Sequence, residues 1–246
     1  MSLGNKWVWP DGKKAAVSLT FDDARTSQVD QGIPLLDRYG IKATFYLSPQ
    51  NIALRNDAWR TAAAHGHEMG NHTLTHPCSG NFLWSRENAL EDKTLDDISV
   101  ELRQATDSIS SLLGVHPISF AYPCGQKYIG RGAELKSYVP LVAKQFLSGR
   151  GFRDETINAP LFCDLAQTMG VDSDDHLFRK LKSWIERAVV EEGWLVFCSH
   201  DVGVFPRQAM PVDVLESVCS YCSDASKGIW IDTVGEIASY IQRIRS

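Results

Sequence analysis

The sequence predicts an α/β fold in one domain over residues 1–246, built on a parallel sheet that closes as a barrel or partial barrel. Short apolar segments alternate repeatedly with amphipathic helical segments, which is typical of parallel strands covered by helices. The 246 residues, 43% hydrophobic and 22% charged, suit one barrel domain of ordinary globular composition. No internal repeat and no linker of distinct composition divides the chain.

The first predicted elements form a βαβ unit. Residues 15–21 and 43–47 are short apolar segments, as expected for buried strands. A helix around residues 34–39 lies between them, and Gly40 is placed to end it.

The remaining elements follow the same alternation. Residues 95–112 carry apolar side chains every three or four positions, which predicts a long amphipathic helix ended by Gly114, before a strand at 118–121. The same spacing over residues 177–189 predicts a helix before a strand at 194–198. A strand at 229–231 and a helix at 234–244 complete the pattern.

Charge and hydropathy exclude several classes of partner. The chain has 25 Lys and Arg against 30 Asp and Glu, a net charge of −5, so non-specific binding of nucleic acid has no electrostatic driving force. No apolar run approaches the roughly 18 residues of a membrane anchor. The N-terminus lacks the apolar stretch of a secretion signal, so we expect a cytoplasmic protein or a processed secreted form. Nothing in the sequence predicts the oligomeric state.

The six cysteines are spread widely along the chain, without the density of a disulfide scaffold. We therefore expect free thiols. Cys219 and Cys222 have C-x-x-C spacing, but they lie in a helical pattern without a second pair, which argues against a zinc or redox site.

Polar clusters follow the predicted strands, where α/β folds gather their chemistry. The first cluster ends in Asp22 and Asp23, whose adjacent side chains diverge and can serve two tasks. Alone, the pair is equally compatible with a capping residue beside a solvated one.

The second cluster holds His72 and His76, which are four residues apart and can converge on one cation. Two imidazoles and one carboxylate around a cation with open positions form a hydrolytic design, because the metal lowers the pKa of bound water towards about 7. The alternative is a pair of surface or structural histidines. His65 and His67 lack this spacing and are interpreted as structural.

A third cluster places His200 directly after the strand at 194–198. Cleavage of an amide needs a general acid that protonates the leaving amine, and an imidazole suits this task. Without the other two clusters, a capping or structural histidine would explain it equally well.

Together these motifs resemble the polysaccharide deacetylase family, the NodB-homology or chitin-deacetylase-like carbohydrate esterases. The resemblance extends over about residues 15–244, with 49 residues from Asp23 to His72 and 124 from His76 to His200. It implies a distorted (β/α) barrel with about seven parallel strands. It also implies a metal-dependent hydrolase that removes N-acetyl groups from an amino-sugar polymer or oligomer.

The resemblance assigns roles residue by residue. Asp22 would be the general base, and Asp23, His72 and His76 would hold one divalent metal. Zn²⁺ is the first expectation, with Co²⁺, Ni²⁺ or Fe²⁺ as alternatives. His200 would be the general acid, oriented by a carboxylate that we predict to be Asp175. The backbone N–H of Cys124 would be the second oxyanion donor.

Two positions depart from the family pattern. His176 stands where a tryptophan often lines the pocket, and Ala121 replaces an arginine that many members use to hold the general base. Without a guanidinium, Asp22 would be a stronger and less firmly oriented base. Arg150 or Arg153, beyond the next strand, could supply the missing charge.

Other functions remain open at this stage. The same fold and metal could hydrolyse a cyclic amide such as allantoin, and two histidines with one carboxylate can also hold Fe(II) in an oxygenase. A non-catalytic carbohydrate-binding relative is a further alternative. A carbohydrate substrate would favour exposed aromatic platforms. The candidates for these are Trp7, Trp9, Trp84, Tyr122 and Tyr128.

Overall fold

The central strand of the structure, a computed structural model, is β1 (Ala15–Asp22), all eight residues of which are buried. Burial of both faces is what the uninterrupted apolar run predicts for a strand between two covered surfaces. The structure describes residues 7–246. Residues 1–6, on which part of the expectation about a secretion signal rests, lie outside the described residues.

Seven strands lie side by side in a curled parallel sheet, which confirms the predicted barrel class. In spatial order the seven are β7 (Ser148–Arg150), β4 (Ser119–Ala121), β3 (Glu68–Asn71), β2 (Thr44–Leu47), β1, β9 (Trp194–Ser199) and β8 (Val171–Asp172). The eighth strand, β12 (Ile229–Ile231), pairs with the first half of β1, whereas β2 pairs with its second half.

The two edges of this sheet are joined by a short stretch of chain. Thr168 forms a parallel bridge with Arg150 of β7, and β8 begins three residues later beside β9. Residues 168–172 therefore pair with β7 at one end and with β9 at the other. This segment, of which only the two-residue strand β8 is a strand of the sheet, joins the two edges, so the barrel is irregular there.

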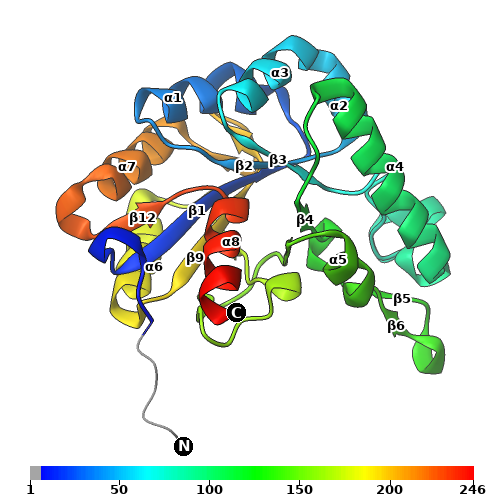
Figure 1. Cartoon of the computed structure of the whole chain (residues 1–246). Helices are drawn as coiled ribbons and strands as arrows, with labels where there is room; N and C mark the ends of the chain where they lie inside the picture. Colours follow the sequence, from blue (N-terminus) through cyan, green and yellow to red (C-terminus); the bar gives the residue numbers. More distant parts are fainter. Residues whose placement is uncertain (1–6) are drawn as a thin grey trace, which may run out of the picture.

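Helices cover the outside of the sheet (Figure 1). The longest one begins at a capping box formed by Thr94 and Asp97 and ends at Gly114, whose φ of 73° is left-handed. The helices are α1 (Ile33–Arg38), α2 (Pro49–Ile52), α3 (Asn56–Ala64), α4 (Leu95–Leu113), α5 (Val139–Gln145), α6 (Phe178–Glu191), α7 (Val212–Ser223) and α8 (Val234–Arg245).

The predicted boundaries agree with these elements to within one or two residues. The strand expected at 118–121 is Ser119–Ala121, and the last helix extends one residue beyond 244. Helix α3 has no counterpart among the predicted elements. It has nine residues, of which only Trp59 and Ala62 are buried, and is too short to show a sustained apolar repeat.

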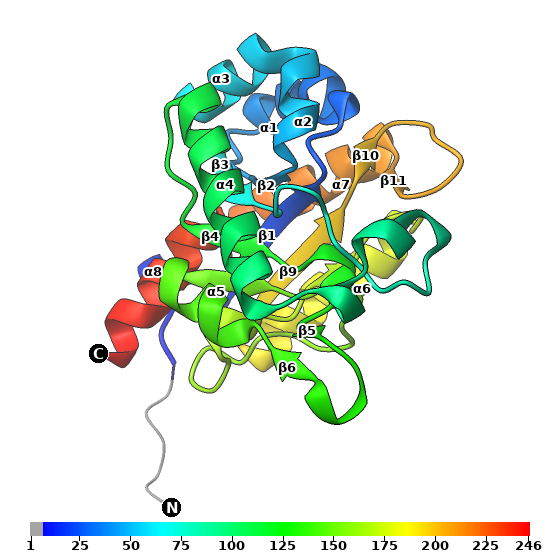
Figure 2. The ribbon, with the colours of Figure 1, turned by 90° about the vertical axis from the view of Figure 1, so that its right-hand side faces the viewer.

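All strands of the main sheet are parallel, so their carboxyl ends meet at one edge. Two small strand pairs extend the loops on this side, away from the C-terminus of the chain (Figure 2). They are the antiparallel pair β5 (Tyr128–Ile129) and β6 (Lys136–Ser137) and the parallel pair β10 (Asp201–Val202) and β11 (Ala209–Met210). Among residues 7–246, no helix has both the length and the apolar character needed to cross a bilayer.

Candidate active site and metal centre

A cavity of about 700 Å³ opens at the carboxyl ends of the strands. Every site residue predicted from the sequence lines it, although the seven come from five separate segments of the chain. These residues are Asp22, Asp23, His72, His76, Cys124, Asp175 and His200.

The proposed metal ligands converge at one end of this cavity. The Oδ1 atom of Asp23 lies 3.7 Å from Nε2 of His72 and 3.7 Å from Nε2 of His76. The three ligand atoms all lie within 4.8 Å of one another, so one cation could contact all of them after a small contraction. The other ring nitrogen of His72, Nδ1, is 2.9 Å from the Ala121 carbonyl oxygen, to which it donates when Nε2 is the ligand.

Both the backbone and the charges suit Asp23 and His76 to this role. Asp23 has a left-handed φ of 75°, which turns its side chain away from that of Asp22. Burial would raise the pKa of Asp23, but the adjacent His72 and His76 lower it to about 2. Burial, aided by His72, lowers the pKa of His76 to about 4, so this imidazole is neutral near pH 7, as a metal ligand must be.

Arg25 is a partner of Asp23 that the sequence analysis missed. Its Nη2 donates to Asp23 Oδ2 at 3.0 Å, and its Nη1 donates to Asp201 at 2.6 Å. The two carboxylate oxygens of Asp23 are thus divided, Oδ1 towards the histidines and Oδ2 towards Arg25. Only its position two residues after Asp23 could have suggested this contact.

The general-base candidate Asp22 is held inside the barrel by Arg150. The guanidinium Nη2 donates to Asp22 Oδ1, and both side chains are almost completely buried. Burial by itself would raise the pKa of Asp22, but Arg150, together with His72 and His200, outweighs burial and lowers the pKa below its usual value. The expectation of a stronger, loosely oriented base was therefore wrong, because this chain retains a guanidinium at the base.

The sheet register explains how Arg150 replaces the arginine missing at position 121. Ala121 and Arg150 are direct neighbours on β4 and β7, so the guanidinium enters the barrel from the adjacent strand. Its Cζ atom lies 4.9 Å from the Tyr46 ring centre. A Cβ on Gly70 would lie only 2.4 Å from an atom of that ring, so the glycine leaves it room. Arg153, the other candidate, is exposed and pairs with Asp172 at 3.0 Å.

The partner of His200 differs from the predicted one. Asp174 Oδ2 lies 2.6 Å from His200 Nδ1, and its Oδ1 accepts from Ser199 Oγ at 2.6 Å. Asp175 instead accepts from the Gln208 N–H at 2.9 Å, so the prediction of Asp175 as the orienting carboxylate was wrong. Asp175 has a left-handed φ of 56°, which turns it away from its neighbour, and the sequence of four acidic or small residues gave no sign of this turn.

The contact with Asp174 contributes to a raised pKa of His200. Burial alone would lower its pKa, but the hydrogen bond to Asp174 and the nearby Asp22 outweigh burial and raise it. A raised pKa keeps the imidazole protonated closer to neutral pH, as a general acid requires.

Cys124 lies at the cavity with its N–H available. Its φ is 53°, and among residues 7–246 no acceptor is hydrogen bonded to this N–H. Its side chain, however, forms a disulfide with Cys78, so the expectation of free thiols was wrong for this pair. The loops after β3 and β4 bring the two Cα atoms to 6.4 Å, although 46 positions separate them in sequence. Cys219 and Cys222 are free and buried in α7, as predicted.

One of the aromatic candidates lines the cavity. Trp84 is 62% exposed, its ring centre lies 5.8 Å from that of His76, and it stacks on Phe82. Tyr128 is exposed beside a smaller cavity of about 350 Å³. Trp7, Trp9 and Tyr122 are buried and pack in the core.

Comparison with known proteins agrees with this geometry. The sequence profile described as Polysaccharide deacetylase matches residues 10–136, just over half of the chain. The chain belongs to the polysaccharide deacetylase family. The matched segment of this deacetylase-family chain contains Asp22, Asp23, His72, His76 and Cys124.

Curated relatives share parts of the chain. It is 30% identical over 168 residues to a gellan lyase of Bacillus sp, a match that covers 68% of this chain and 6% of the relative. It is 31% identical over 91 residues to a peptidoglycan-N-acetylglucosamine deacetylase of Bacillus cereus, covering 37% of this chain and 41% of the relative. Each match therefore spans less than half of the relative.

Solved structures share the fold over most of the chain. A Mycobacterium smegmatis protein described as a polysaccharide deacetylase has a TM-score of 0.70 at 16% identity, covering 97% of this chain and 94% of that one. A family 4 acetyl xylan esterase from Clostridium thermocellum, solved with a cobalt ion, has a TM-score of 0.60 at 18% identity, covering 92% and 91%.

The role of Arg150 can be tested on the acid limb of the pH profile. Arg150→Met should move the acid limb of kcat/KM to higher pH, because Arg150 lowers the pKa of the carboxylate that must be ionised. It should also lower the free energy of unfolding by about 3–5 kcal/mol, since Asp22 would be left buried and unpaired. Arg150→Lys should keep the limb nearer its wild-type position, and Arg153→Met should not move it. An unchanged limb in Arg150→Met would contradict the assignment.

The adjacent carboxylates offer a matched pair of variants for His200. Asp174→Asn should move the alkaline limb of kcat/KM to lower pH, because it removes the hydrogen bond that raises the pKa of His200. It should also slow turnover by roughly 10²-fold, the order of a positioned general acid's contribution. Asp175→Asn should leave the alkaline limb in place. Equal shifts in the two variants would show that Asp174 has no special role.

Proposed function

We propose that this chain is a metal-dependent hydrolase that removes N-acetyl groups from an acetylated amino-sugar polymer or oligomer. The observation that carries the proposal is that two groups in one cavity have pKa values shifted in opposite directions, Asp22 downwards and His200 upwards. Arg150 keeps Asp22 ionised, and Asp174 raises the pKa of His200, with the donor group of Asp23, His72 and His76 in the same cavity. Paired base and acid beside a cation site are what hydrolysis of an unactivated amide requires.

The donor set fits a divalent cation. It consists of one carboxylate and two imidazoles, and Ala121 fixes the orientation of His72 through its carbonyl oxygen. Zn²⁺ suits such borderline ligands, and Co²⁺, Ni²⁺ and Fe²⁺ are chemically compatible. When bound, the cation would supply Lewis acidity towards the substrate carbonyl and water.

The chain's own residues would then carry the proton transfers. Asp22 accepts the proton of the attacking water, and the buried Arg150 keeps that carboxylate oriented. The Cys124 N–H donates a hydrogen bond to the oxygen on which negative charge develops. His200, held by Asp174, donates a proton to the departing amine.

The cavity favours a saccharide over a small cyclic amide. Its volume is about 700 Å³, and Trp84 presents an exposed ring at its margin, next to His76. Stacking on such a ring is a common way to bind the apolar face of a sugar. The family membership and the similarity to a peptidoglycan-N-acetylglucosamine deacetylase support the same substrate class.

The proposal predicts acetate release that depends on the cation. Protein loaded with Zn²⁺ should release acetate and free amine from N-acetylglucosamine oligomers, lose this activity after chelation, and regain it when Zn²⁺ is returned. His72→Ala should bind the cation much more weakly. The matched control is His65→Ala, because the imidazole of His65 contacts Asp37 on α1 and lies outside the donor group. This variant should bind the cation normally.

The same assay should include acetylated xylan and allantoin. Preference for allantoin would show that the substrate is a cyclic amide and not a glycan. Preference for acetylated xylan would show that the bond hydrolysed is an ester and not an amide. Full activity on the oligomers after complete removal of the metal would refute the proposed chemistry.

A further inference from the structure

The two proposed metal-binding histidines are oriented by different partners. Nδ1 of His72 faces the Ala121 carbonyl oxygen, a strong acceptor, at 2.9 Å. Nδ1 of His76 lies 3.7 Å from Cys78 Sγ, and Cys78 is fully buried. A ligating histidine ordinarily donates its second N–H to an acceptor that fixes the ring. For His76 a sulfur of the Cys78–Cys124 disulfide occupies that position.

The other end of the same disulfide holds the proposed oxyanion donor. Cys124 lies in a short 3₁₀ turn (Pro123–Gly125), with a left-handed φ of 53° that only a few non-glycine residues adopt. This conformation leaves its N–H without an acceptor among the described residues, at the edge of the cavity. A covalent link from its side chain restricts how that turn can relax.

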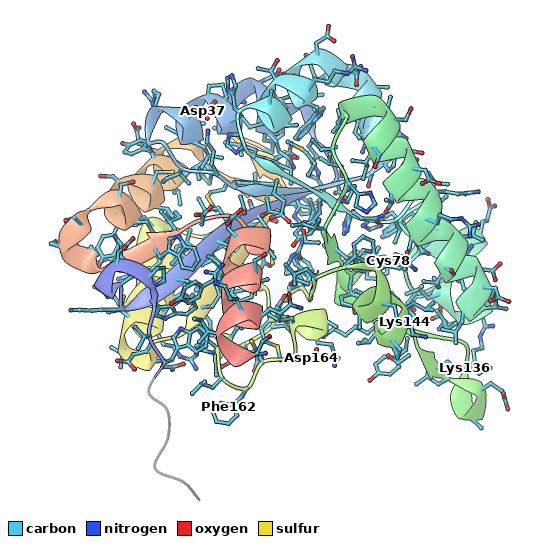
Figure 3. The ribbon with its side chains drawn as sticks, in the orientation of Figure 1. Asp37, Cys78, Lys136, Lys144, Phe162 and Asp164 are labelled. Atoms are coloured by element: carbon cyan, nitrogen blue, oxygen red, sulfur yellow. A yellow bond between two sulfur atoms is a disulfide. The ribbon has the colours of Figure 1, made fainter. Side chains whose placement is uncertain are left out.

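The disulfide also joins two loops that the sheet places side by side. Strands β3 and β4 are neighbours, paired at Asn71 and Phe120, and the loops that follow them carry Cys78 and Cys124. Figure 3 labels Cys78, which lies between α4 and α5 in that view. A second link runs beside the disulfide, because the Ser79 N–H donates to Gln126 Oε1 at 2.7 Å.

We propose that the Cys78–Cys124 disulfide positions both His76 and the Cys124 N–H, so that the protein is fully active only when this disulfide is formed. The side chains of the two cysteines act through other groups, so their role in this inference is to position the site. The activity part of this inference rests on the proposed hydrolase function, whereas the effect on cation binding does not. The reducing step has a defined balance: a phosphine and water convert the disulfide into two thiols, and the phosphine becomes its oxide.

The fold should survive loss of the disulfide. The backbone of Cys78 is held separately, since its N–H donates to Ser85 Oγ at 3.0 Å and its carbonyl oxygen accepts from the Leu90 N–H at 3.0 Å. The link between Ser79 and Gln126 also remains. A change in activity can therefore be separated from unfolding.

The test compares oxidised protein, protein reduced with tris(2-carboxyethyl)phosphine, and the double variant Cys78→Ser with Cys124→Ser. Thiol titration should show two more thiols after reduction, and thermal unfolding should show that every form is folded. Both the reduced protein and the double variant should lose roughly 10- to 100-fold in kcat on acetylated oligomers, with KM little changed. Competition with a chromogenic chelator should show weaker Zn²⁺ binding by the double variant.

Two matched controls make the result specific. Cys163→Ser removes a free, half-buried thiol and should respond to the phosphine as the wild type does. Gln126→Ala removes the neighbouring loop link without touching His76, and should keep kcat and Zn²⁺ affinity. An equal loss in Gln126→Ala would overturn the proposal, because generic loop tethering would explain it.

Unchanged kcat and unchanged Zn²⁺ affinity in the folded double variant would also overturn it. If the oxidised wild type releases no acetate from any substrate, the proposed deacetylase function fails instead. The Zn²⁺ affinity of the double variant then still decides whether the disulfide positions His76.

Discussion

Two adjacent carboxylates, the buried Asp22 and the partly buried Asp23, must both stay ionised, and the arrangement of the site depends on how the structure achieves this. Burial would raise the pKa of each, yet both are lowered. His72 and His200 contribute to both shifts, Arg150 acts on Asp22, and His76 and Arg25 act on Asp23. Asp22 points into the barrel towards Arg150, whereas the left-handed backbone at Asp23 turns its side chain towards His72 and His76. One dipeptide therefore provides a base candidate and a ligand candidate that contact different side chains.

Arg150 shows that the position of a charge matters more than the strand that supplies it. The register places Arg150 beside Ala121, and the small alanine leaves room for the guanidinium to cross towards β1. Tyr46 packs on the guanidinium, and Gly70 leaves space for that ring. Towards the other edge of the sheet, His200 follows the last residue of β9, and Asp174 contacts its imidazole. The parallel register thus sets base, cation ligands and acid around one cavity.

The sequence predicted the elements with strong periodicity and the residues that gather at the strand ends. Thr94 and Gly114 mark the limits of α4, and all seven predicted site residues line the cavity, because parallel strands bring their carboxyl ends together. Three features were beyond it. The choice between Asp174 and Asp175 depends on one left-handed residue. The contact of Arg25 with Asp23 depends on the rotamer of a side chain. The Cys78–Cys124 bond depends on the pairing of β3 with β4. Each is a consequence of tertiary geometry that local spacing does not encode.

The central claim is that Asp22 and Asp23 have separate tasks, and the most direct test is the Zn²⁺ stoichiometry of Asp22→Asn and Asp23→Asn, measured with the turnover of each loaded protein. The account predicts that Asp22→Asn keeps close to one equivalent of Zn²⁺ while kcat falls by about 10²- to 10⁴-fold, since only the general base is lost. It predicts that Asp23→Asn loses the metal itself. Equal loss of Zn²⁺ in the two variants, or turnover retained by Asp22→Asn, would contradict the account.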